Sequence, residues 1–208
     1  MLRWLLSALW ICVLTGTVTG AKVEVAGAPQ GISLNNDFIV KVRPEGKSKW
    51  VLVPTYLVKV DEVRETKHHV EHASMATFDF SEKVEIEVTY NKGKIDSARG
   101  RPLSYDIPFT IEGNTLQFSL EKPANLSVEV NGDIFHNLHL FANPLDTFKV
   151  DKKNPDLIYF GPGIHRFEGG EFRIPSGKTV YVAGGTVMMG RMLIENVHDV
   201  KLLGRGII

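Results

Sequence analysis

The most conspicuous group of side chains that could bind a metal or transfer protons is a histidine cluster. His68, His69 and His72 lie close together in the sequence, with Glu71 directly before His72. On a helix, His68 and His72 would share one face and could bind zinc together with a third ligand. On a strand, His68 and His72 lie on one side, and His69 and Glu71 on the other. The neighbouring residues have a strand pattern and the spacing differs from His-Glu-x-x-His, so we expect a solvated strand or loop and no metal site.

Paired carboxylates can cleave a glycosidic bond, since one protonates the leaving oxygen while the other activates water, at ~6.5–9.5 Å in inverting enzymes. Glu168 and Glu171 are the only close acidic pair in residues 157–208, and they flank Gly169-Gly170. Glycines side by side are typical of a turn. We therefore expect this pair in a solvated loop and assign no catalytic residue to it.

Exposed aromatic rings can stack on sugar rings, and Trp50, Tyr56, Tyr105 and Tyr159 are candidates for that role. Large aromatics also fill protein cores, so we expect each of the four in the core. Asn125-Leu126-Ser127 is an N-glycosylation sequon, which matters only in a eukaryotic secretory route.

Short alternating runs separated by turn residues fill residues 22–141. Side chains alternate between the two faces of a strand, so each run buries one face and wets the other. Many short strands of this kind predict a β-sandwich. The clearest runs are residues 38–42, 83–90 and 115–120.

A tight hairpin is predicted where Asn131-Gly132 separates residues 126–130 from 133–135, because Asn-Gly accepts the positive φ angles of a type I′ turn. Residues 56–70 could form either a helix or a strand, since four of their apolar residues fall near helical spacing. Their valine content and the alternation of Tyr56, Val58 and Val60 favour a strand.

A polar connection follows, with Asn143-Pro144 and then residues 151–155, which end in Pro155. Proline restricts the backbone, as expected of a link between domains. We expect a sandwich domain over residues 21–150 and a different domain over residues 151–208. Ten of the nineteen glycines lie in this last part.

The last part of the chain repeats itself. Three segments read as four strand-like residues, a glycine, two turn residues and an apolar residue, and their glycines Gly161, Gly184 and Gly204 are 23 and 20 positions apart. Such periods predict a solenoid whose coils cover one another. Glycine-rich hairpins without a true repeat are the alternative. The chain ends at Ile208 inside the third copy, so we expect an unfinished solenoid.

The first residues have the pattern of a secretory signal peptide: Arg3, an apolar run over residues 4–14, and small residues up to Ala21. A membrane anchor is the alternative, but the run is shorter than the ~20 residues that span a bilayer. Cleavage after Gly20 would remove Arg3 and Cys12, the only cysteine, leaving 23 basic and 24 acidic side chains. This balance argues against nucleic-acid binding, and we expect a secreted or periplasmic protein without disulfides.

Residues 159–165, 174–185 and 196–207 resemble the first coils of a right-handed parallel β-helix. The similar families are pectin-lyase-like glycoside hydrolases, namely polygalacturonases of family 28 and dextranases of family 49, some with an N-terminal β-sandwich. Residues 138–144 resemble the closing strand of that sandwich. The resemblance therefore implies an all-β fold, a sandwich followed by the start of a truncated β-helix.

The resemblance also implies function: inverting hydrolysis of a pectin-like or dextran-like polysaccharide by aspartates, without a metal or other cofactor. The set of Asn-x-Asp, Asp-Asp, Gly-His-Gly and Arg-x-Lys motifs that marks the polygalacturonase active site does not occur in this sequence. We therefore expect the catalytic residues beyond Ile208, an inactive fragment, and a monomer that does not bind membranes after signal cleavage. Alternatives are a non-catalytic polysaccharide-binding or adhesion protein and a polysaccharide lyase.

Overall fold

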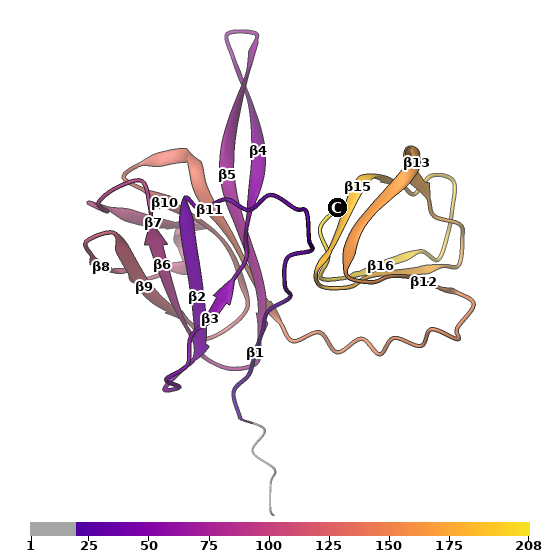
Figure 1. Cartoon of the computed structure of the whole chain (residues 1–208), viewed down its shortest axis with the longest axis horizontal. Helices are drawn as coiled ribbons and strands as arrows, with labels where there is room; N and C mark the ends of the chain where they lie inside the picture. The colour runs from indigo at the N-terminus through magenta and orange to yellow at the C-terminus, as the bar shows by residue number, and fades with distance from the viewer. Residues whose placement is uncertain (1–19) are drawn as a thin grey trace, which may run out of the picture.

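The computed structural model describes residues 20–208, which fold almost entirely into β-strands in two groups (Figure 1). The predicted signal peptide lies outside the described residues, apart from Gly20. Within the described part, the 3-10 turn η1, Leu103–Tyr105, is the only helical element. No helix in residues 20–208 has the length and apolar character needed to cross a membrane.

The first group is a sandwich of two sheets. One sheet has the order β1-β5-β11-β10-β7, with β4 paired to β5 at its side. Its strands are β1 (Val23–Glu24), β4 (Thr55–Arg64), β5 (Lys67–Phe80), β7 (Ala98–Arg101), β10 (Ala124–Val130) and β11 (Asp133–Pro144). The other sheet has the order β3-β2-β6-β9-β8. It contains β2 (Phe38–Pro44), β3 (Val51–Val53), β6 (Val84–Tyr90), β8 (Thr110–Glu112) and β9 (Thr115–Leu120).

One hydrophobic core joins the two sheets. Phe38 and Ile86 come from the five-stranded sheet, Phe78 and Leu140 from the other, and all four side chains are buried in the same cluster. Alternation produces this core: β2 and β6 each bury every second residue over most of their length. The predicted strands at residues 38–42, 83–90 and 115–120 are confirmed as β2, β6 and β9.

The Asn-Gly hairpin is also confirmed. Asn131 and Gly132 have φ angles of 54° and 79° and join β10 to β11. Residues 138–144, expected as a closing strand, form the end of β11. This strand lies between β10 and β5 and runs parallel to β5, with Leu138 beside Ser74. It is therefore internal to the sheet.

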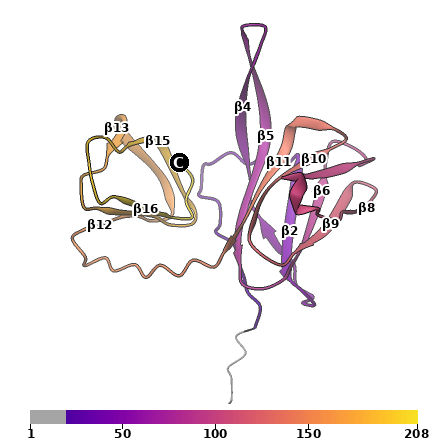
Figure 2. The ribbon, with the colours of Figure 1, turned by 180° about the vertical axis from the view of Figure 1, so that it is seen from behind.

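Strands β4 and β5 form a long hairpin that projects beyond the sandwich (Figures 1 and 2). The strand expected over residues 56–70 is correct in type, but it is two strands. Glu65 and Thr66, with φ angles of 48° and 67°, make the turn between them. This turn could not be predicted from residue types, because neither glutamate nor threonine favours positive φ.

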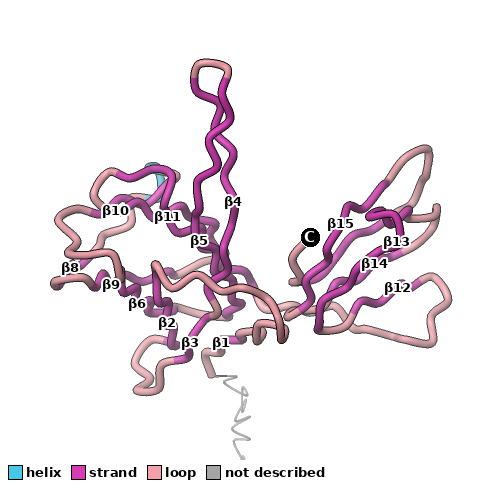
Figure 3. Tube along the Cα trace, turned by 45° about the horizontal axis from the view of Figure 1, so that its top comes forward, coloured by secondary structure: helices cyan, strands magenta, loops and turns pink. Residues whose placement is uncertain are grey.

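The second group consists of stacked coils, drawn as parallel rungs in Figure 3. One face carries β12 (Leu157–Phe160), β14 (Thr179–Val182) and β16 (Lys201–Gly204), and a second carries β13 (Gly163–Arg173) and β15 (Thr186–Leu193). All these pairings are parallel. Four buried residues, Ile174, Val180, Val182 and Met188, form the core inside the coils.

The repeat is real, but its predicted register is wrong. Leu157, Thr179 and Lys201 occupy the same position on successive coils, at intervals of 22 residues. Gly204 therefore pairs with Val182, and not with Gly184. The reason is that packing between side chains of successive β-strands sets the register of the coils. The glycine-rich turns that connect the strands differ in length, so their glycines need not align.

Candidate functional site

The histidine cluster lies on the projecting hairpin, as the expected solvated strand. The Nδ1 atom of His68 is 2.8 Å from an Asp61 carboxylate oxygen, and both side chains are mostly exposed. His72 pairs with Lys59 on the neighbouring strand. Within residues 20–208, no three histidine, cysteine, aspartate or glutamate side chains gather as a metal site requires.

Glu168 and Glu171 were expected in a loop, but both lie in strand β13. Between them, Gly169 and Gly170 have positive φ, and the pairing of β13 with β15 shifts its register there. Glu171 makes ion pairs with Arg191 and Arg173. The hydrogen bond from Arg191 lowers the pKa of Glu171. A general acid needs the opposite shift, so Glu171 is not suited to donate a proton.

The aromatic candidates separate into three situations. Tyr56 is buried, as expected. Tyr159 is half-buried on β12, where its ring stacks on Tyr181 and lies under the Lys152 ammonium. Trp50 is only partly buried and Tyr105 is 48% exposed. The core prediction was therefore wrong for these two and for Tyr159, none of which belongs to a core cluster.

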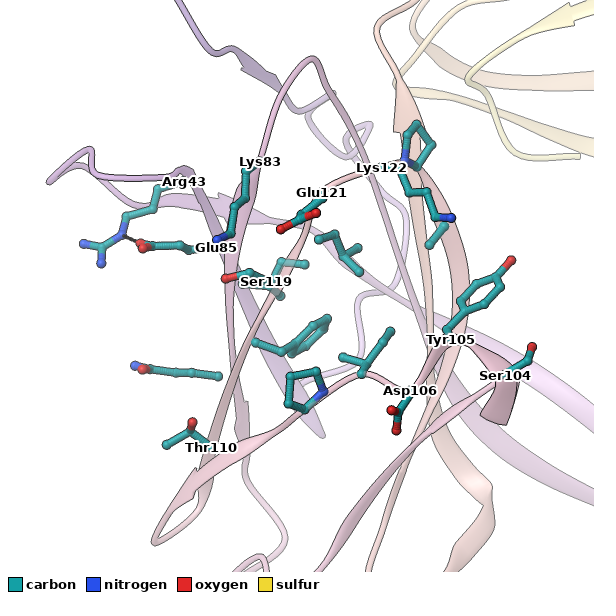
Figure 4. A pocket seen from close by; sticks show the side chains of 18 of the residues that line it. Arg43, Lys83, Glu85, Ser104, Tyr105, Asp106, Thr110, Ser119, Glu121 and Lys122 are labelled. Atoms are coloured by element: carbon teal, nitrogen blue, oxygen red, sulfur yellow. Dashed lines mark hydrogen bonds and ion pairs between the residues drawn. The ribbon is translucent and has the colours of Figure 1, made fainter.

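Trp50 and Tyr105 line one surface groove, which we call the β9 groove, with a volume of about 1080 Å³. Figure 4 shows this groove with Tyr105 among its labelled side chains. It opens beside β9, where the partner strand β8 is short. Strand β8 pairs with β9 only as far as Gln117, so Phe118–Leu120 has no strand on that side. Further lining comes from the end of β2, from the start of β6 and Lys83 before it, from Thr110 on β8, and from residues 104–108 and 121–124.

Charges around the β9 groove are balanced. Arg43, Lys83 and Lys122 face Glu85, Asp106 and Glu121. The guanidinium of Arg43 is 2.5 Å from Glu85 and lies over the Trp50 ring at 4.2 Å from its centroid. Lys83 pairs with Glu45 at 2.7 Å, and this hydrogen bond raises the pKa of Lys83.

A second polar cluster connects the sandwich to the coils, and we call it the Asp79–Arg205 cluster. Arg205 Nε donates to both carboxylate oxygens of Asp79 at 2.8 Å, and its Nη2 donates to the Pro144 carbonyl at 2.8 Å. Tyr181 Oη donates to Asp146 at 2.7 Å, and the Asp146 backbone donates to Asp79. Residues from β5, the connection, β14 and the end of the chain thus meet at one point.

Burial controls the protonation of this cluster. Desolvation raises the pKa of Asp79, and the hydrogen bond and charge of Arg205 oppose that rise. Burial and the bond to Asp146 together raise the pKa of Tyr181 to about 12. Phe148 stacks on Tyr181 with a centroid separation of 4.9 Å, which holds the connection against the coil face. The cluster is a structural joint between the two groups of strands.

The tripeptide Asn-x-Asp does occur by itself, and each copy forms a turn. Asn35 and Asn154 each accept a hydrogen bond from the backbone two residues later, as in an Asx turn. The third copy is the Asn131-Gly132 hairpin. None belongs to a group of carboxylates. The sequon residue Asn125 is exposed on β10.

No family model and no curated protein sequence matches this chain. Among solved structures, the chain is similar to Dex49A from Penicillium minioluteum, with a TM-score of 0.63 and 14% identity. The match covers 88% of this chain and 47% of that one, so it includes both the sandwich and the coils, and the chain spans about half of its neighbour's length. The fold is therefore all-β, a sandwich followed by coils of a parallel β-helix, and it is shared with Dex49A.

Proposed function

We propose that this chain supplies the sandwich and the first β-helix coils of a secreted enzyme that hydrolyses glycosidic bonds in a polysaccharide. The observation that carries the proposal is the combined match of sandwich and coils to Dex49A, whose name places it with the family 49 dextranases. A fold by itself does not dictate chemistry. The β9 groove adds independent support, because it presents aromatic and polar side chains together.

For the mechanism, we propose single-displacement inversion by an aspartate acid and an aspartate base outside residues 20–208. Two observations favour this placement. About half of the neighbouring structure has no counterpart in this chain. In the acidic pair Glu168 and Glu171 on the coils, Glu171 is ion-paired with Arg173 and Arg191, which favour its ionised form. Such a carboxylate is a poor proton donor.

Three further expectations accompany the proposal. Residues 1–20 act as a signal peptide that directs the protein to the periplasm or the extracellular space. Residues 21–150 and 151–208 are separate domains of one monomeric chain. The partner is a polysaccharide, and the reaction needs no cofactor.

Activity measurements test the proposal. Residues 21–208 are expected to release no reducing ends from dextran or polygalacturonate, whereas a protein that continues into the aspartate-bearing coils is expected to hydrolyse one of them. Proton NMR of the first products should show inverted anomeric configuration, as single displacement requires. Turnover by residues 21–208 that persists through repurification would contradict the placement of the acid and base, and retained configuration would contradict the mechanism.

A further inference from the structure

Resting on the proposed function, we propose that the β9 groove is a binding subsite for a neutral polysaccharide chain, separate from the site of hydrolysis. Its volume of about 1080 Å³ slightly exceeds the range for small-molecule sites, which is roughly 300–1,000 Å³. The groove is therefore large enough for several linked sugar rings. Its walls come from strand ends and from η1, which a folded sandwich holds in place (Figure 4).

Two aromatic side chains give the groove apolar surface of the kind that sugar rings cover. Tyr105 lies on η1 with almost half of its surface in water. Trp50 precedes β3, and the Arg43 guanidinium fixes its ring by covering one face. Apolar surface left in water is unfavourable, so the C–H face of a sugar ring gains free energy by stacking there. Neither ring is needed to fill the sandwich core, whose cluster includes neither residue.

Polar groups beside these rings match sugar hydroxyls. The carboxylates of Asp106 and Glu121 line the groove and accept no hydrogen bond within the described part of the chain. A carboxylate can accept two hydroxyl hydrogen bonds, which fixes the orientation of a sugar ring. Ser119 adds a hydroxyl from the edge of β9 that has no strand beside it.

The charge balance selects a neutral polymer. Two of the three cations are already paired, Arg43 with Glu85 and Lys83 with Glu45, which leaves Lys122 against Asp106 and Glu121. A polyanion such as polygalacturonate requires an excess of positive charge where it binds. The groove has none, so a neutral glucan fits it better than an acidic chain does.

Isothermal titration with soluble dextran, on residues 21–208 and single variants, tests the subsite. Tyr105→Ala and Trp50→Ala are each expected to weaken dextran binding about tenfold, as loss of one stacked aromatic implies. Tyr105→Phe keeps the ring and is expected to stay within about twofold. Leu103→Ala is the matched control, because Leu103 is exposed on the same η1 turn but does not line the groove.

The outcomes separate the two proposals. Dextran binding that Tyr105→Ala and Trp50→Ala leave unchanged would overturn the groove assignment while the proposed function stands. Equal losses in Leu103→Ala would also overturn it, since the effect would then not belong to the groove. Wild-type residues 21–208 that bind no dextran would also overturn the groove assignment, whereas the proposed function is overturned only if the longer protein hydrolyses neither dextran nor polygalacturonate.

Discussion

Gly204→Ala is expected to unfold the coils while the sandwich stays folded. Gly204 has a φ of +118°, and a Cβ atom there would lie 1.9 Å from the carbonyl oxygen of Val182 on the neighbouring coil. That oxygen belongs to the backbone and accepts hydrogen bonds from Arg205 and Gly206, so it cannot move without opening the coil. We expect a loss of at least about 4 kcal/mol in the free energy of unfolding of the coils.

Amide hydrogen exchange followed by mass spectrometry checks this prediction. Exchange should become fast in β14 and β16 and remain slow in β6. Gly113→Ala is the matched control, because Gly113 also has positive φ, at +63°, but no atom lies within 4 Å of an added Cβ. It should cost only about 1–2 kcal/mol, the usual penalty for that conformation. Unchanged protection of β14 and β16 in Gly204→Ala would contradict the stacked-coil register.

Arg205→Met should destabilise the joint between sandwich and coils by about 3 kcal/mol, since it leaves the carboxylate of Asp79 buried without its cation. Asp79 is 6% exposed, and the lost partner made two hydrogen bonds to it. Urea unfolding at pH 7 measures the loss. The double variant Asp79→Asn with Arg205→Met removes the unpaired charge and should recover most of the stability.

The pH dependence of the stability of Arg205→Met is a second test of this prediction. Burial raises the pKa of Asp79, and without Arg205 the strongest opposing interaction is gone. A carboxyl whose pKa is higher in the folded than in the unfolded state favours folding at low pH, and this advantage is lost as pH rises through the folded-state pKa. The loss in free energy of unfolding of Arg205→Met relative to wild type should therefore become smaller as pH falls from 7 to 4. A deficit that grows on acidification would show that Asp79 is not the group responsible.

Sequence patterns correctly predicted those strands and turns whose conformation depends on residues close together in the chain. Alternation identified β2, β6 and β9, because each buries one face against a single core. Asn131-Gly132 identified its hairpin, because few residue pairs accept two positive φ angles. The parallel pairing of β11 with β5 depends on residues far apart in the chain, and no local pattern encodes it.

The groove could not be predicted for a related reason. Trp50 and Tyr105 lie in an irregular segment before β3 and on a 3-10 turn, where alternation assigns no face. They line one groove only because the sandwich brings segments far apart in the sequence together. The Asp79–Arg205 cluster is similar, since its two charged partners are 126 residues apart.

Migration through native gels containing dextran or polygalacturonate tests the central claim most directly, namely that this β-sandwich with β-helix coils serves an enzyme acting on a neutral polysaccharide. Wild-type residues 21–208 are predicted to be retarded by dextran in proportion to its concentration, and to run through polygalacturonate as through an empty gel. Retardation by polygalacturonate alone would contradict the neutral substrate, and unretarded migration in both gels would contradict polysaccharide binding altogether.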